Sequence, residues 1–195
     1  MIAAALEPLY RAYLRRLDEM AARLPAEALL RESTTRAADG GVALGPGGLP
    51  MIFDVADSRG GETFEVCGAA PDQPALRQAR QGGIEVEAGP GNWEALPVAC
   101  TLEEAGDADL LALADLFRAW ALLASSGAFA AGAPAPWSGR LHGVRIELGG
   151  AGLVATLDLG TCPPRALEAL VAALDGFGRD HARLTRVAIG LPPQA

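Results

Sequence analysis

The most informative absence in this sequence is lysine, because all sixteen basic residues are arginine. A Walker A phosphate loop, a Schiff-base nucleophile, a pyridoxal phosphate anchor and a protein-kinase ATP site each require a lysine. The sequence therefore excludes these sites, and we expect no cofactor. Together with abundant alanine, glycine and proline, the exclusive use of arginine is typical of a GC-rich, bacterial-type genome.

Histidine and cysteine are also scarce. The two histidines, His142 and His181, lie far apart, and no Cys-x-x-Cys or His-x-x-x-His spacing occurs, so a zinc site is not expected. The three cysteines, Cys67, Cys100 and Cys162, are odd in number and widely separated. This pattern favours reduced thiols over a disulfide framework.

Positive charge is in deficit, with a formal net charge of −8. Nucleic acids and anionic membranes attract proteins that carry a concentrated positive field, so we expect neither as a partner. The first residues lack a basic segment before an apolar core, and Glu7 and Pro8 interrupt them. We therefore expect no secretion signal and a cytoplasmic location.

The apolar content is high, at 50% of 195 residues, which is enough for one sizeable core. We expect a single globular domain over residues 1–195. It has possible halves at 1–101 and 102–195, with Gly-rich or Pro-rich flexible loops at 33–48 and 125–139. A shift of 91 residues superposes parts of the two halves, which indicates a possible weak two-half repeat.

The clearest structural pattern is a β-hairpin over residues 141–158. Two alternating segments flank a turn at 149–152, and this turn would place apolar residues opposite one another on a single face. The predicted pairs are Leu148 with Leu153, Ile146 with Ala155, and Val144 with Leu157. A helix from Pro163 and a short strand at 186–190 follow.

The remaining segments predict further helices and hairpins. We expect an amphipathic helix at 8–24, a hairpin joining 51–57 to 62–67, a short helix at 74–80 and a hairpin joining 83–88 to 95–101. The run at 107–124 is apolar almost all round and predicts a buried central helix. The fold class is therefore α+β, with antiparallel hairpins in one or two sheets covered by three main helices.

Cys162 is the strongest catalytic candidate, because it lies at the start of a predicted helix, where the helix dipole lowers a thiol pKa. The hairpin register places Gly143 opposite Asp158, so His142 lies near the strand that leads to Cys162. Cys162, His142 and Asp158 could then act as nucleophile, base and orienter. Two prolines after Cys162 are also explained by a helix start alone.

Four carboxylates around the second hairpin form a weak candidate metal site: Asp54, Asp57, Glu62 and Glu65. The expected register opposes Asp54 to Glu65 and Asp57 to Glu62, and like charges opposed across strands are destabilising. A hard cation such as calcium could compensate them. Screening by Arg59 or Arg145, or by solvent, is the simpler interpretation and requires no metal.

Two tryptophans in predicted loops, Trp93 and Trp137, are candidates for exposed anchors that bind a protein partner. The expected order of helices and strands is similar, at the level of architecture, to that of small acidic secretion chaperones. We therefore expect a noncatalytic binding, assembly, adaptor or chaperone-type protein that acts on a protein partner, with a possible homo-oligomer through an edge strand. The alternative is a small thiol-dependent or acid-base enzyme using Cys162 and His142.

Overall fold

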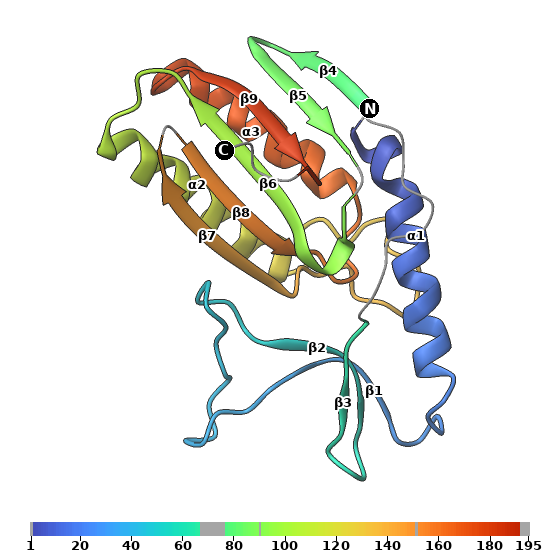
Figure 1. The fold of residues 1–195 in the computed structure, drawn as a ribbon. Helices are drawn as coiled ribbons and strands as arrows, with labels where there is room; N and C mark the ends of the chain where they lie inside the picture. Colours follow the sequence, from blue (N-terminus) through green and yellow to red (C-terminus); the bar gives the residue numbers. More distant parts are fainter. Residues whose placement is uncertain (1, 67–76, 90, 151, 192–195) are drawn as a thin grey trace.

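The described residues fold into three α-helices, one 3-10 helix and two mostly antiparallel sheets, so the predicted α+β class is confirmed (Figure 1). This computed structural model describes residues 2–66, 77–89, 91–150 and 152–191. The elements are α1 (Ile2–Ala21), β1 (Leu29–Thr34), β2 (Ile52–Asp57), β3 (Thr63–Phe64), β4 (Arg77–Gln81), β5 (Ile84–Ala88), the 3-10 helix η1 (Trp93–Ala95), β6 (Leu96–Leu102), α2 (Asp107–Ser125), β7 (Gly143–Gly149), β8 (Gly152–Asp158), α3 (Arg165–Asp180) and β9 (Leu184–Ile189).

The hairpin β7–β8 has the predicted register at every predicted pair. Val144 lies opposite Leu157, Ile146 opposite Ala155 and Leu148 opposite Leu153, and Gly143 lies opposite Asp158. The turn contains Gly150 at φ +55°, a left-handed conformation that favours glycine. The pattern was sufficient here because a hairpin with one apolar face has a single register that buries that face.

The strand order β4-β5-β9-β6-β8-β7 shows that the predicted hairpin between 83–88 and 95–101 is wrong. Strand β9 lies between β5 and β6, parallel to β5 and antiparallel to β6. Its Val187 and Ile189 are fully buried, which explains why the apolar strand takes the interior position. The amide of Gly190 extends the contact by donating to the carbonyl of Pro97 at 2.8 Å.

The helix predicted at 74–80 is also corrected, because residues 77–81 form the edge strand β4. Strand pairing with β5 overrides the helical preference of alanine, arginine and glutamine. The side-chain amide of Gln78 adds a bond of 2.8 Å to Glu87. Residues 74–76, on which the proposed two-half repeat also relied, lie outside the described residues.

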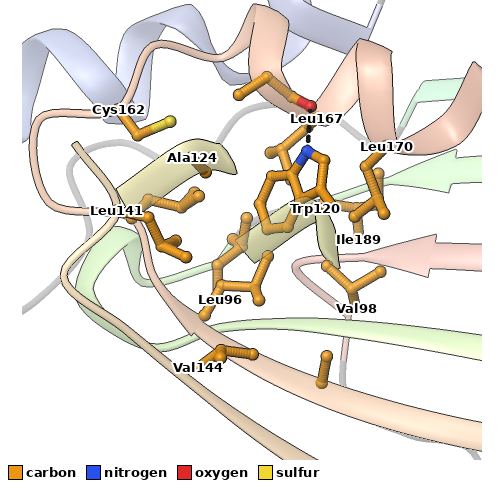
Figure 2. Packing of buried hydrophobic residues seen from close by; sticks show 14 of the residues in the cluster. Leu96, Val98, Trp120, Ala124, Leu141, Val144, Cys162, Leu167, Leu170 and Ile189 are labelled. Atoms are coloured by element: carbon orange, nitrogen blue, oxygen red, sulfur yellow. Dashed lines mark hydrogen bonds between the residues drawn. The ribbon is translucent and has the colours of Figure 1, made fainter. Parts of the chain in front are cut away.

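Helices α2 and α3 cover one face of the six-stranded sheet, while no helix of the described residues covers the face turned to the viewer in Figure 1. The covered face is lined by fully buried leucines and valines, each of which contributes about 1.5–3 kcal/mol on burial. Figure 2 shows Trp120 of α2 at the centre of this packing. Its indole N–H donates to the carbonyl of Ala166 at 3.0 Å, so the ring also ties α2 to α3.

Helix α2 is a surface helix, which corrects the prediction of a buried central helix. Leu113, Phe117 and Trp120 point into the core, whereas Leu111 and Leu122 are 55% and 57% exposed. Among the described residues, no helix combines the length and the apolar character needed to cross a membrane.

The small sheet has the order β1-β2-β3, and Figure 1 shows it below the six-stranded sheet. The predicted pairing of Val55 with Phe64 is confirmed. Strand β1 was not predicted; it pairs antiparallel to β2 along residues 29–34. Together, β1 and β2 bring two acidic side chains to the main body.

Candidate functional site

The centre of the candidate site is His142, which lies directly before β7 and is 5% exposed. Its Nε2 is 3.2 Å from Oε1 of Glu32, and its Nδ1 is 3.1 Å from Oδ1 of Asp54. Glu32 and Asp54 belong to the paired strands β1 and β2. The imidazole therefore bridges two carboxylates and joins the small sheet to the main body.

Both carboxylates have further hydrogen-bond donors. Glu32 accepts bonds from the hydroxyl of Thr161 and the backbone amide of Ser138. Asp54 accepts bonds from the hydroxyl of Tyr13 in α1 and, at 2.7 Å, from the amide of Val66. A buried charge requires this degree of compensation, because each unsatisfied group costs free energy.

Two left-handed backbone positions shape the cluster. Glu32 has φ +48°, which is uncommon for a residue with a side chain. Gly160 has φ +50°, and a Cβ at this position would lie 2.3 Å from Cδ2 of His142. Only glycine can therefore occupy position 160 while the imidazole keeps its position.

The pKa shifts indicate that Glu32 and His142 are both ionised. Burial alone would raise the pKa of Glu32, but the hydrogen bonds from His142, Thr161 and Ser138 lower it to about 2. Burial alone would lower the pKa of His142, but its contacts with Asp54 and Glu32 and the charge of Asp158 raise it to about 10. At neutral pH the imidazolium of His142 therefore lies against the ionised Glu32.

Asp158 lies close enough to His142 to interact with its charge, as the predicted register implied. Burial raises the pKa of Asp158 to about 7, against the opposing effect of His142. Its Oδ1 accepts a bond of 3.2 Å from the amide of Gly160. The pairing of His142 with a nearby acid was thus predictable, although its two direct partners were not predicted.

Cys162 does not have the environment expected of a thiolate. It is fully buried, and burial raises the pKa of its thiol to about 12, so the expected lowering by the helix dipole is wrong. Within the described part of the chain, its Sγ makes no hydrogen bond to His142, whose ring nitrogens both contact carboxylates. The arrangement therefore does not activate a thiol nucleophile.

The four candidate metal ligands have separate environments. Asp54 belongs to the buried cluster, whereas Asp57 binds Arg59 at 3.3 Å, as the screening interpretation predicted. Glu62 and Glu65 are exposed. Over the described ranges, no group of three or more histidine, cysteine or acidic residues has a metal-binding arrangement.

Trp93 and Trp137 are 3% and 6% exposed, so the prediction that they are exposed is wrong. The indole N–H of Trp93 donates to the carbonyl of Gly160 at 2.9 Å, and that of Trp137 donates to Asp18 at 3.0 Å. Both rings fold back over the core next to the cluster. They stabilise the loops around the site instead of presenting an anchor to a partner.

Glu32, Thr161 and Tyr13 are the site residues that sequence reasoning missed. A signal for Glu32 existed, because recognition of β1 as a strand would have paired it with β2 near Asp54. No short-range pattern connects Thr161 or Tyr13 with the cluster. Comparison of the chain with protein-family models, curated proteins and solved structures found no match.

Proposed function

We propose that this chain is a noncatalytic protein-binding factor of the adaptor or chaperone type, which acts on a protein partner. The observation that supports this proposal is that the ionisable cluster is buried, whereas the surface presents exposed apolar side chains. The histidine cluster is buried and saturated with hydrogen bonds, whereas several large apolar side chains are exposed. Exposed apolar side chains are costly in water and suit contact with another protein.

The proposed binding surface, called here the 30–51 surface, lies on the ribbon that links β1 to β2, where Val42 is 42% and Leu44 is 61% exposed on the same face. The backbone that carries them is ordered by hydrogen bonds. The amide of Met51 donates to the carbonyl of Ala43 at 2.9 Å, and that of Ala43 donates to Thr35 at 2.9 Å. These side chains are therefore held on a folded ribbon.

The His142 cluster gives this surface a fixed orientation, because Glu32 and Asp54 anchor the sheet from which the ribbon extends. Strand β1 is also an edge of its sheet within the described chain. An edge strand can add a strand from a partner, with backbone hydrogen bonds for affinity and side chains for specificity. We infer an extended apolar segment of the partner as the group that is recognised.

Site-specific photocross-linking in the native host tests this proposal. A benzoylphenylalanine at Leu44 is expected to give one discrete adduct with another protein, and the same group at exposed Arg179 is expected to give none. The identified protein, once purified, should bind the wild-type chain at least ten-fold more tightly than Leu44→Asp. Absence of a Leu44-specific adduct, or equal binding by Leu44→Asp, would refute the proposal.

The alternative enzyme using Cys162 and His142 has less structural support. Its nucleophile would require deprotonation of a buried thiol, and its base is an imidazole already held by two carboxylates. We therefore favour a positioning role for His142 over a catalytic one.

A further inference from the structure

The outer face of α2 carries a second group of exposed side chains, separate from the 30–51 surface. Leu111, Asp115, Arg118 and Leu122 follow one another at spacings of four, three and four residues, so they form one stripe along the helix. Leu111 and Leu122 are 55% and 57% exposed. Between them, Arg118 and Asp115 form an exposed ion pair of 2.7 Å.

The stripe is symmetric about the point midway between residues 116 and 117. With a rise of 1.5 Å per residue, the two leucines lie about 8 Å on either side of this midpoint. The two charges lie about 2 Å on either side. Reversal of the helix direction therefore exchanges leucine with leucine, but acid with base.

We propose that this stripe binds a second copy of the same chain, with the two α2 helices antiparallel around a two-fold axis through the midpoint. Leu111 of one copy then meets Leu122 of the other at both ends of the contact. At the centre, Asp115 of each copy meets Arg118 of the other. The interface is isologous, so each contact occurs twice.

Charge complementarity favours this occupant and this orientation. Parallel packing of two copies would bring Asp115 against Asp115 and Arg118 against Arg118, and like charges repel. An unrelated apolar peptide would not require the acid and the base at mirrored positions. The antiparallel pair satisfies both the charges and the leucines.

The ends of the stripe have additional apolar surface. Beside Leu111, a hollow is lined by Leu110 and by Leu148 and Gly149 at the β7–β8 turn. Leu148 is 42% exposed, and Leu123 at the other end of the helix is 54% exposed. Figure 1 shows α2 behind β7 and β8, on the outside of the covered face of the sheet.

Sedimentation equilibrium of purified protein over a concentration series tests this inference. Wild type is expected to approach twice the chain mass of 20.0 kDa, or about 40 kDa. Asp115→Arg and Arg118→Asp, each alone, place like charges at the centre and should weaken the dimer at least ten-fold. The exposed variant Glu103→Arg, outside the stripe, is the matched control.

A mixture of the two single variants gives the sharpest result, because their charges become complementary. A 1:1 mixture of Asp115→Arg and Arg118→Asp should form a heterodimer about as strong as the wild-type dimer. The Asp115→Arg/Arg118→Asp double variant should also dimerise. Circular dichroism confirms that each variant is folded. A wild type that remains monomeric at about 100 µM would overturn the inference, as would folded single variants that dimerise normally.

This inference is independent of the proposed function. The dimer uses α2, whereas partner binding uses the 30–51 surface. Loss of the dimer in Asp115→Arg should leave the Leu44 adduct intact, so failure of one proposal does not imply failure of the other.

Discussion

The substitution His142→Gln removes the positive charge from the buried cluster while retaining a hydrogen-bond donor. The pKa of His142 rises from 6.5 to about 10, which corresponds to about 4 kcal/mol of stability at pH 7 by proton linkage. Removal of one partner from a buried ion pair typically costs about 3–5 kcal/mol. The two routes agree, so we expect the variant to lose about 4 kcal/mol at pH 7.

The pH dependence gives this prediction a distinctive sign. Because the folded pKa is raised, the contribution of His142 is complete below about pH 6.5 and is lost as pH rises through about 10. The cost of His142→Gln should therefore fall to about 1 kcal/mol near pH 9.5. Urea unfolding followed by tryptophan fluorescence measures the free energy at each pH.

Two further variants make the test specific. His181→Gln is the matched control, since this histidine is 43% exposed at its side chain and should change stability by less than about 0.5 kcal/mol. In His142→Gln, Glu32 loses its positively charged partner, and Glu32→Gln removes that unpaired carboxylate. The double variant should therefore be more stable than the sum of the two single effects predicts. Additive effects, or a pH-independent cost, would refute the idea of an ionised pair of His142 and Glu32.

Three other changes probe the surroundings of the cluster. Burial raises the pKa of Asp158 from 3.8 to about 7, so the free energy of unfolding should fall as pH rises through 7. Asp158→Asn should abolish about 2–3 kcal/mol of the stability that the wild type loses between pH 5 and pH 8. An unchanged dependence of stability on pH would contradict this. Gly160→Ala should destabilise the protein by at least about 2 kcal/mol more than Gly150→Ala. Gly150 is the control because it has a similar positive φ, but a Cβ there would have no neighbouring atom within 4 Å. Equal melting temperatures of the two variants would disprove the contact with His142. Cys162 should resist iodoacetamide from pH 6 to 9 in the folded protein when modification is mapped by mass spectrometry, and rapid alkylation below pH 8 would revive the thiol enzyme.

Local patterns in the sequence predicted the elements whose contacts are local. The β7–β8 register followed from alternation around a glycine turn, and α2 and α3 followed from apolar periodicity. The predicted helix at 8–24 is α1 in part, because α1 already begins at Ile2, contains Pro8 and ends at Ala21. Strand β9 was predicted, but its place between β5 and β6 was not, because pairing over such a separation leaves no mark in either segment. The residues of β4 favour a helix, and the pairing with β5 that makes them a strand is not visible within the segment itself.

Only the part of the candidate site that lies in the β7–β8 hairpin could be predicted from the sequence. His142 and Asp158 lie in one hairpin, so their proximity could be deduced from the register. Glu32 lies in β1 and has a positive φ, a conformation that the strand propensity of its residue type does not predict. The predicted role of Cys162 relied on the helix dipole, whereas its full burial, which is the main cause of its raised pKa, depends on the whole fold.

The interior position of β9 has a consequence for synthesis of the chain. A ribosome releases β5 and β6 long before β9, and until then the middle of the large sheet lacks one strand. Until β9 pairs with them, β5 and β6 each present an unpaired edge that can bind other aggregation-prone segments. Truncation before Leu184 should produce insoluble protein, because β9 joins β5 to β6 in the described sheet.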